Sequence, residues 1–341
     1  MKIIGITGTN GKTTITHVIS EILTKAGFKV GKIGTLTGRL TTPSPWELAE
    51  LFESFRKEGC QYVIMEASSH GIHQDRLKGI FFHIKVLTNI TQDHLDYHKT
   101  FSEYKKVKLG WMAKGHGIKI YPKDWAKVHL DFPHPYMGHF NDNNIKSAYA
   151  VLQALNCIPE QKLKALFKDL SPVPGRYQPI ICGQPFKVIV DYAHTPDGLQ
   201  NVIDTSLKIL RKERKGGKLI TLFGCGGDRD KGKRPMMGHI AFTQSYISVV
   251  TSDNPRTENA EAILKDVVVG MQPKWYHKNK QVIVECDRHI AVRKAIELAG
   301  PNDLVLLAGK GHETYQIIGA ERIHFDDREE ATAALNARGY V

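Results

Sequence analysis

The sequence lacks the features that would place the chain in a membrane or in an oxidising compartment. Its 341 residues contain no apolar run of about 18 residues, the length that a membrane-spanning helix requires. The five cysteines, at positions 60, 157, 182, 225 and 286, show no CxxC spacing, which is typical of reduced thiols. No signal peptide is recognisable, because the apolar start runs directly into glycine, threonine and asparagine. We therefore expect a cytoplasmic protein that does not act on membranes.

The sequence also lacks the pattern of a nucleic-acid-binding protein, although its formal net charge is +12 at pH 7. Lys and Arg are spread along the chain. The densest group, KILRKERKGGK at residues 208–218, is typical of a solvated helix end with its loop; a polyanion-binding patch is the alternative. No aromatic residues are interleaved with this group, as they would be in an RNA-binding segment. The charge therefore favours acidic, phosphorylated small-molecule substrates and no nucleic acid.

The first half of the chain shows strand and helix patterns without internal repeats. Residues 1–6 (MKIIGI) predict a short buried strand, and apolar residues at helical spacing over 15–23 predict a helix that ends at Gly27. Segments 61–68 and 84–91 predict further buried strands that end in polar residues. Strands of a parallel sheet have this appearance when their carboxyl ends carry a site.

Proline and glycine cluster at residues 170–180, after a helical stretch, and this break indicates a domain boundary. Strand and helix patterns alternate again beyond it. We therefore predict two α/β domains, residues 1–172 and residues 173–341. The strands predicted in the second domain are 186–192, 218–224, 246–252, 281–286 and 303–309, with helices that include 262–271 and 290–299.

The segment TGTNGKTT, which follows the first predicted strand, has the composition of a phosphate-binding loop. The strict pattern GxxxxGK[ST] requires glycine where this chain has Ile6, so only the core GxxGKT matches. Glycines let backbone N–H groups approach phosphate oxygens, Lys12 neutralises phosphate charge, and the Thr13 hydroxyl can bind Mg²⁺. An ordinary glycine-rich turn is a poor alternative, because a strand precedes the segment and an amphipathic helix follows it. We predict that ATP is bound in a P-loop ATPase-type domain by Gly8, Thr9, Asn10, Gly11, Lys12, Thr13 and Thr14.

Acidic and histidine residues follow the next two predicted strands. Glu66 ends one of them, where a carboxylate can hold Mg²⁺, and TNITQDHLDYH at 88–98 supplies two aspartates and two histidines. The i,i+4 spacing of His94 and His98 is compatible with zinc on a helix, but no glutamate follows His94 as in the HExxH motif. We predict a Mg²⁺ site formed by Thr13, Glu66 and His94. A structural zinc and ordinary surface histidines are the alternatives.

Eight motifs, in sequence order, resemble those of the Mur ligases: GTNGKTT, MEASSHG, TNITQDHLDYH, PGRYQ, DYAHTPDGL, GCGGDRDKGKRP, DNPRTE and AGKGHETYQ. The resemblance covers essentially the whole chain and is greatest to the tripeptide-synthetase type, which adds meso-diaminopimelate. It implies a central ATP-binding domain followed by a Rossmann-like, amino-acid-binding C-terminal domain. It also implies a C–N ligase in which ATP phosphorylates an acceptor carboxylate, and an amino group then displaces the phosphate from this acyl phosphate.

The resemblance further implies roles for individual residues. Lys108 matches a family lysine that CO₂ converts to a carbamate, an anionic ligand for a metal; by itself it would be taken, with Lys105 and Lys106, for a charged helix face. Arg256 in DNPR matches the form associated with diaminopimelate, whose distal carboxylate an arginine can bind bidentately. The implied catalytic residues are Lys12, Glu66, His94, Lys108 and Arg176, and the implied metal ligands are Thr13, Glu66, His94 and Lys108.

The remaining implied residues fall into three sets. The ATP site would be completed by Asn141, Asn144, Arg176, Asp191 and His194. The acceptor, a muramoyl-peptide, would be held by Thr41, Thr42, Ser68, Gln74 and Arg76. The incoming amino acid would contact Arg229, Asp253, Asn254, Pro255, Arg256, Gly309 and Glu313.

The match departs from the family at two places. Relatives normally carry a UDP-binding domain before the phosphate loop, and they have more residues between Lys108 and the segment near residue 138. Three expectations stay open: an acceptor without the UDP-sugar, a separate protein that supplies the domain, and weak binding of the UDP acceptor or a shortened chain. A non-catalytic nucleotide-binding subunit is the alternative from another class. A ligase that adds glutamate to a folate-like acceptor fits the fold but not DNPR and GKGHE.

Overall fold

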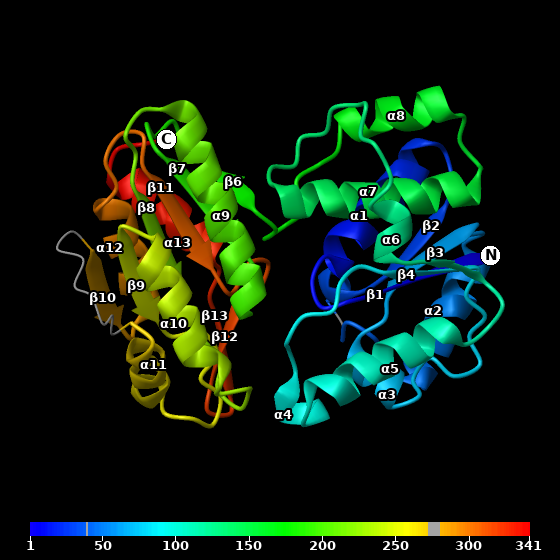
Figure 1. Cartoon of the computed structure of the whole chain (residues 1–341), viewed down its shortest axis with the longest axis horizontal. Helices are drawn as coiled ribbons and strands as arrows, with labels where there is room; N and C mark the ends of the chain where they lie inside the picture. Colours follow the sequence, from blue (N-terminus) through cyan, green and yellow to red (C-terminus); the bar gives the residue numbers. More distant parts are fainter. Residues whose placement is uncertain (39, 272–279) are drawn as a thin grey trace. The chain divides into compact units, whose positions relative to one another are not determined.

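Two separate sheets organise the chain (Figure 1). The computed structural model describes residues 1–38, 40–271 and 280–341. These residues divide into unit 1, Met1–Pro172, and unit 2, Val173–Val341. Among the described residues, no helix is both long enough and apolar enough to cross a membrane.

Unit 1 is built on a five-stranded parallel sheet in the order β2-β3-β1-β4-β5. Ile4 and Ile6 face a core formed with α1 (Lys12–Lys25) and α7 (His139–Leu155). Val63 and Met65 face a second core on the other side of the sheet. Burial on both faces explains why these strands are continuous apolar runs. The strands are β1 (Lys2–Thr7), β2 (Val30–Ile33), β3 (Tyr62–Glu66), β4 (Ile84–Leu87) and β5 (Ile118–Ile120).

Local signals set the ends of the helices in unit 1. α1 (Lys12–Lys25) ends in a Schellman motif, because Gly27 has φ 101° and the N–H of Phe28 reaches the carbonyl of Leu23. α2 (Pro45–Lys57) begins with a capping box in which Ser44 and Glu47 satisfy each other's backbone N–H groups. The other helices are η1 (Thr35–Thr37), α3 (Ser69–His73), α4 (Leu95–His98), α5 (Phe101–Ala113), α6 (Pro122–Trp125), α7 (His139–Leu155) and α8 (Glu160–Lys168).

Unit 2 has a six-stranded sheet in the order β10-β9-β8-β11-β7-β6, parallel except for the edge strand β6. The sequence analysis did not anticipate β6 or the antiparallel hairpin β12–β13. The strands are β6 (Gln178–Ile180), β7 (Lys187–Asp191), β8 (Leu219–Phe223), β9 (Ile247–Thr251), β10 (Gln281–Glu285), β11 (Leu304–Ala308), β12 (Tyr315–Ile318) and β13 (Glu321–His324).

The helices of unit 2 cover its sheet. They are α9 (Pro196–Glu213), α10 (Lys233–Gln244), α11 (Ala260–Val269), α12 (Arg288–Glu297) and α13 (Asp327–Ala337). The basic segment 208–218 forms the end of α9 and the loop after it, and its lysines and arginines are exposed. The α/β prediction is therefore confirmed, and the basic segment is the solvated helix end that the sequence predicts.

Candidate active site

The loop between β1 and α1 has a backbone that only glycine can adopt at two positions. Gly8 has φ 150° and Gly11 has φ 89°. A β-carbon would lie 1.8 Å from Oγ1 of Thr88 at Gly8, and 2.3 Å from Oδ1 of Asn144 at Gly11. No side chain caps the start of α1. The N–H groups of its first turn are therefore not engaged by a capping side chain, as a phosphate site requires.

The segment after β4 fixes the shape of this loop. Oγ1 of Thr88 donates to the carbonyl of Asn10 at 2.6 Å, and the N–H of Asn10 donates to Oδ1 of Asn89 at 2.9 Å. The hydroxyl of Thr9 lies 2.8 Å from that of Tyr104. The loop is thus bonded both to the segment after β4 and to α5.

Lys12 and two asparagines of α7 complete the surroundings of the loop. Nζ of Lys12 donates to the carbonyls of Gly8 and Thr9 at 2.9 and 2.8 Å. The amide of Asn144, which contacts Gly11, donates to Oδ1 of Asn141 at 3.2 Å. Residues of α7 and of the loop, far apart in the sequence, thus meet at the predicted nucleotide site.

Glu66 lies at the centre of a hydroxyl cluster at the end of β3 and is only 1% exposed. Its Oε2 accepts from the hydroxyls of Thr13 and Thr35, both at 3.1 Å, and its Oε1 accepts from the N–H of Thr35 at 2.9 Å. Oγ1 of Thr35 lies 3.1 Å from that of Thr41. Sequence reasoning missed Thr35, although its position directly after β2, at the carboxyl edge of the sheet, is the signal that indicates it.

The predicted acceptor residues join the same cluster through Thr42. Its hydroxyl donates to the carbonyl of Glu66 at 2.9 Å and accepts from the N–H of Ser68 at 2.9 Å. Its carbonyl accepts from Nη1 of Arg76 at 2.7 Å, and Nε of Arg76 donates to Oε1 of Gln74 at 2.9 Å. Together with Thr41, all five predicted acceptor residues therefore form one network with Glu66.

Lys108 differs from the other lysines of α5. Lys105 and Lys106 are exposed, whereas Lys108 is 1% exposed and its Nζ donates to the carbonyl of Gly8 at 2.9 Å. Burial, followed by the charge of Lys12, holds the pKa of Lys108 well below its usual value. Lys108 is therefore not part of a solvated helix face, and burial makes its amine easier to deprotonate than that of an exposed lysine.

The two histidines with i,i+4 spacing do not lie on one helix face, because His94 precedes α4 with φ 55°. Nε2 of His94 lies 3.3 Å from Oδ2 of Asp93, and its ring packs edge-on against His70. His98 is buried; burial, followed by the charges of neighbouring histidines, lowers its pKa to about 4. Within residues 1–38, 40–271 and 280–341, no three His, Cys, Asp or Glu residues form a group that could hold a metal ion. The zinc alternative gains no support.

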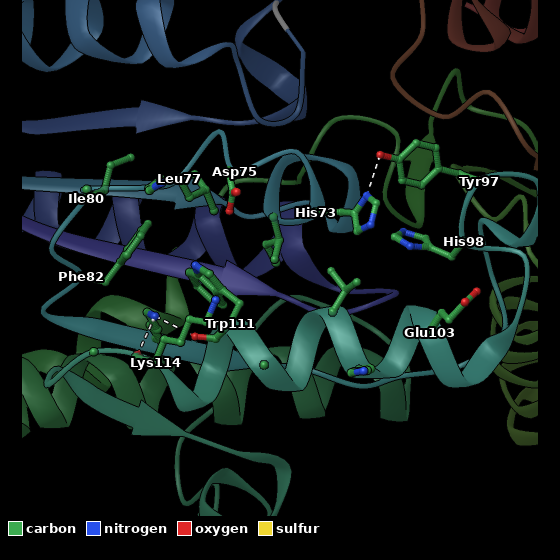
Figure 2. A pocket seen from close by; sticks show the side chains of 18 of the residues that line it. His73, Asp75, Leu77, Ile80, Phe82, Tyr97, His98, Glu103, Trp111 and Lys114 are labelled. Carbon is green, nitrogen blue, oxygen red and sulfur yellow. Dashed lines mark hydrogen bonds between the residues drawn. The ribbon is translucent and has the colours of Figure 1, made fainter.

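A cavity of about 940 Å³ lies along α5 in unit 1 (Figure 2). Leu77, Phe82 and Trp111 contribute apolar surface. At the other end is Tyr97, whose hydroxyl accepts from the amide of Gln74 at 3.1 Å, so the cavity adjoins the acceptor network. Five lysines also line it: Lys78, Lys85, Lys99, Lys106 and Lys114.

In unit 2, three predicted nucleotide residues surround Tyr192, directly after β7. The guanidinium of Arg176 lies over the Tyr192 ring at 4.4 Å, and Nδ1 of His194 is 2.8 Å from the Tyr192 carbonyl. Asp191 is buried and accepts two backbone N–H groups at 2.6 and 2.7 Å. Burial raises the pKa of Asp191 to about 6, although Arg176 and these N–H groups oppose the shift.

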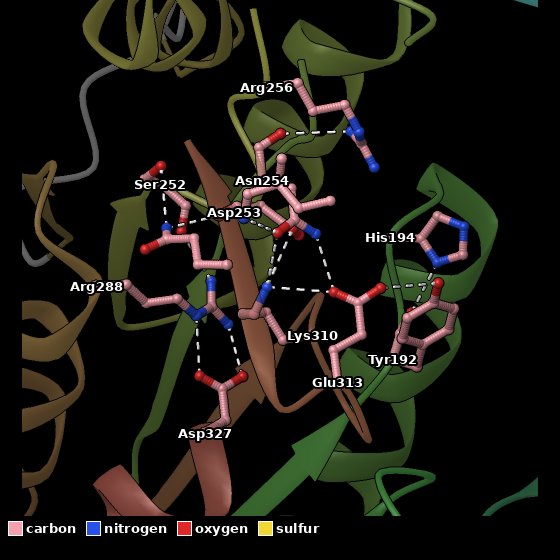
Figure 3. A network of polar contacts seen from close by, with 12 residues as sticks. Tyr192, His194, Ser252, Asp253, Asn254, Arg256, Arg288, Lys310, Glu313 and Asp327 are labelled. Atoms are coloured by element: carbon pink, nitrogen blue, oxygen red, sulfur yellow. Dashed lines mark hydrogen bonds and ion pairs between the residues drawn. The ribbon is translucent and has the colours of Figure 1, made fainter. Parts of the chain in front are cut away.

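The motifs after β9 and β11 meet around one fully buried lysine, Lys310 (Figure 3). Its Nζ lies 3.1 Å from Oδ1 of Asn254, 3.2 Å from Oε2 of Glu313 and 3.9 Å from Oδ1 of Asp253. The amide of Asn254 donates to Glu313 at 2.9 Å. A β-carbon at Gly309 would lie 2.9 Å from Oδ2 of Asp253. Sequence reasoning missed Lys310, even though it stands inside the quoted GKGHE motif.

The two carboxylates of this cluster have opposite pKa shifts. Burial raises the pKa of Glu313, and the negative charge of Asp253 adds to this effect. Burial also acts to raise the pKa of Asp253, but the charges of Lys310 and Arg288 outweigh it and hold this pKa below its usual value. The cluster therefore contains one firmly ionised carboxylate and one that gains a proton more easily.

The two predicted arginines, Arg229 and Arg256, both lie close to Gly226. A β-carbon there would be 2.9 Å from Nη1 of Arg256 and 3.7 Å from Cγ of Arg229. Arg256 has φ 54° and donates to the carbonyl of Gly227 at 2.8 Å. A β-carbon at Gly227 would lie 1.8 Å from the Pro255 carbonyl. Because glycine has no β-carbon, the loop that carries Arg229 can approach the loop that carries Arg256. The predicted amino-acid residues of unit 2 thus gather at the carboxyl edge of its sheet.

The chain matches two family descriptions: the Mur ligase middle domain at residues 6–133, and the Mur ligase, glutamate ligase domain at residues 175–311. The UDP-N-acetylmuramoyl-L-alanyl-D-glutamate–2,6-diaminopimelate ligase 1 of Clostridium acetobutylicum is 41% identical over 381 aligned positions, covering 96% of this chain and 77% of the relative. The ligase of the same name, without the number, from Thermosynechococcus vestitus is 38% identical, covering 99% and 77%. The resemblance seen in the motifs is confirmed.

Solved structures agree with these relatives. A structure of UDP-N-acetylmuramoyl-L-alanyl-D-glutamate–2,6-diaminopimelate ligase aligns with a TM-score of 0.61 and 30% identity, covering 100% of this chain and 79% of that one. The E. coli FolC structure with DHPP and ADP aligns with a TM-score of 0.68 at 17% identity, covering 99% of this chain and 89% of that one, which shows a shared fold. The similarity extends through both units of the chain.

Proposed function

The chain belongs to the Mur ligase family, and from this premise we propose that it joins diaminopimelate to the carboxylate of a glutamyl peptide in an ATP-dependent reaction. The chain is a C–N ligase, as its family is. The substrates proposed here are those that its relatives are named for, a muramoyl-linked alanyl-glutamate and 2,6-diaminopimelate.

One observation carries the proposal: a single buried residue, Glu66, contacts both predicted sites of unit 1. Glu66 accepts from Thr13 of the phosphate loop and, through its backbone carbonyl, from Thr42 of the acceptor network. A phosphoryl group held by the loop would therefore lie beside the acceptor. This arrangement favours transfer to a carboxylate over simple hydrolysis.

The residues around the loop fit a nucleotide with Mg²⁺. The carboxylate of Glu66 and the hydroxyl of Thr13 are hard oxygen ligands, which phosphate oxygens and water would complete. Held by these residues, Mg²⁺ would supply positive charge to neutralise the transferring phosphoryl group. Lys12 would release the Gly8 and Thr9 carbonyls to bind phosphate oxygens. We place His94 in a supporting role at the same phosphates.

Lys108 fits the carbamate that the family resemblance implies. Only a neutral amine can attack CO₂, and burial of Lys108 favours that form. Its position at the carbonyl of Gly8 would put the anionic carbamate next to the phosphate loop, where it could serve as an oxygen ligand.

The charges of unit 2 fit a zwitterionic amino acid with an extra carboxylate. Asp253 and Glu313 would receive its ammonium groups, and Arg229 and Arg256 its carboxylates. The attacking amino group then displaces phosphate from the activated acceptor and forms the amide. The lysine-lined cavity along α5 would accommodate the anionic remainder of the acceptor.

The proposal is tested by measuring ADP release with ATP, Mg²⁺ and meso-diaminopimelate, with product masses recorded. Two acceptors are compared: UDP-N-acetylmuramoyl-L-Ala-D-Glu and the free dipeptide L-Ala-D-Glu. We expect an amide product that requires both amino acid and acceptor. Preference between the two acceptors decides whether the UDP-sugar is recognised. ADP release without an amide product from either acceptor would refute the proposed substrates.

A further inference from the structure

We propose that Arg288 and Asp327 form a positioning pair that fixes the two amino-acid-binding loops of unit 2 relative to each other. The pair lies behind these loops, at the starts of α12 and α13 (Figure 3). The inference rests on the proposed function only in that the loops are assigned to the amino acid.

The pair is completely buried and well oriented. Both side chains are 0% exposed, and Nε and Nη2 of Arg288 donate to the two carboxylate oxygens of Asp327 at 2.9 and 2.7 Å. A buried ion pair of this kind is stable only when its remaining hydrogen-bonding capacity is satisfied. The groups that accept the remaining hydrogen bonds of the pair therefore indicate what the pair holds in place.

Arg288 uses its remaining hydrogen-bonding capacity to donate to backbone carbonyls next to both loops. Its Nη1 donates to the carbonyl of Ser252 at 3.3 Å, and its Nη2 donates to the carbonyl of Ala308 at 3.0 Å. Ser252 directly precedes the DNPR segment, and Ala308 directly precedes the GKGHE segment. One planar guanidinium thus connects the backbones of Ser252 and Ala308, the residues that directly precede the two segments.

The pair is needed because β9 and β11 are not neighbours; β8 lies between them. Gly224, at the end of β8, packs tightly against the loop after β9, since a β-carbon there would lie 2.6 Å from the Thr251 carbonyl and 3.0 Å from the backbone nitrogen of Asp253. Further along the DNPR segment, Arg256 is bridged to Ile318, but the described residues show no strand pairing that connects residues 252–254 with residues 308–310. Arg288 supplies that connection from α12, which packs on the sheet below.

The charge of Arg288 also acts on the site itself. It is one of the cations that keep Asp253 ionised, together with Lys310. Loss of the pair would therefore displace the loops and weaken the ionisation of a carboxylate that receives the amino acid. A lysine retains the charge but cannot bond two carbonyls and a carboxylate in one plane.

The test compares Arg288→Lys, Asp327→Asn and the double variant with the wild-type full chain. We expect the KM for diaminopimelate to rise on the order of tenfold, with the KM for ATP unchanged. The double variant should be no worse than the more affected single variant, because the pair acts as a unit. Asp327→Asn preserves the side-chain shape, so it provides the test if Arg288→Lys does not fold.

Hydrogen–deuterium exchange of the unliganded proteins gives a readout that does not depend on turnover. In Arg288→Lys we expect faster exchange confined to residues 252–257 and 308–314. Val292→Ala, which removes a fully buried apolar group one turn further along α12, is the matched control for lost stability alone.

An equal rise in the two KM values, or faster exchange spread over unit 2 as in Val292→Ala, would overturn the positioning role. If the wild-type chain does not use diaminopimelate, the proposed function fails, while the exchange pattern still decides whether the pair fixes the loops.

Discussion

The two units carry their predicted site residues at equivalent places, the carboxyl ends of parallel strands, but the chemistry of the two sites differs. Unit 1 uses backbone amides and hydroxyls around one buried carboxylate, Glu66. Unit 2 uses buried charges of both signs, centred on Lys310 and Glu313. Phosphate can be bound by preorganised N–H groups, whereas a zwitterion needs opposite charges, and each buried charge needs a partner. Unit 1 should therefore depend on backbone shape, and unit 2 on charge geometry.

The largest effect should come from Lys12, the lysine that belongs to the phosphate loop itself. We expect Lys12→Ala to reduce kcat on the order of 10³-fold, because no other side chain of the loop can neutralise phosphate charge. Steady-state ADP release measures this. Lys25→Ala, at the opposite end of α1 in an ion pair with Glu21, is the control and should retain activity. Full activity of Lys12→Ala would show that the ligase site does not lie in unit 1.

The dependence of unit 1 on backbone shape is tested with two glycines of positive φ. We expect Gly11→Ala to lower kcat/KM for ATP about 10²-fold, since its β-carbon would collide with Asn144 inside the loop. Gly27→Ala also has positive φ, but nothing lies within 4 Å of its β-carbon. It should cost about 1 kcal/mol of stability without loss of activity. Equal activities of the two variants would mean that the loop shape is not important.

The dependence of unit 2 on charge geometry is tested by a substitution that preserves charge. We expect Arg256→Lys to raise the KM for diaminopimelate on the order of tenfold, because lysine lacks the planar fork that binds a carboxylate bidentately. The preference for diaminopimelate over L-lysine, measured as a ratio of kcat/KM values, should fall, while the KM for ATP serves as the internal control. An unchanged preference would show that Arg256 does not bind the distal carboxylate.

The smallest expected effect concerns pH and a histidine of unit 2. Burial, followed by the charge of Arg176, lowers the pKa of His312 to about 3 from 6.5. Between these values the unfolded chain binds a proton that the folded chain does not, so stability falls as the pH falls. Between pH 6.5 and pH 4.5, the free energy of unfolding of His312→Gln should fall by about 2 kcal/mol less than that of wild type.

Urea unfolding at both pH values measures this difference. His239→Gln, at an exposed position of α10, is the matched control and should follow the wild-type curve. Parallel pH curves for His312→Gln and wild type would contradict the assignment of His312 as a neutral, buried group.

Much of the fold could be predicted because most of the predicted strands are buried on both faces; the exception is β10, a partly exposed edge strand that is still rich in β-branched residues. Every strand predicted in the second half contains a strand of the structure, from β7 to β11. The short edge strand β6 and the hairpin β12–β13 gave no such signal, since edge and hairpin strands are only partly buried; β13 is exposed throughout. The formation of these strands depends on the neighbouring strands with which they pair, rather than on a hydrophobic pattern in their own residues.

The same distinction applies to the sites. The phosphate loop is contiguous, so the order of its glycines, lysine and threonines was enough to predict it. Thr35 and Lys310 were missed, because a threonine or a lysine has no recognisable role until its neighbours are known. The family resemblance identified Lys108, but only its position reveals that the amine is buried at the carbonyl of Gly8.

The sequence by itself determined the α/β class and the membership of the Mur ligase family, and it predicted the phosphate loop, because these depend on short patterns of neighbouring residues. Only the tertiary structure decided which charges and hydroxyls meet. Thr13 and Glu66 are 53 positions apart, Arg288 and Asp327 are 39 apart, and Gly8 and Lys108 are 100 apart. Contacts over such separations form when helices pack on a sheet, and no local pattern encodes them.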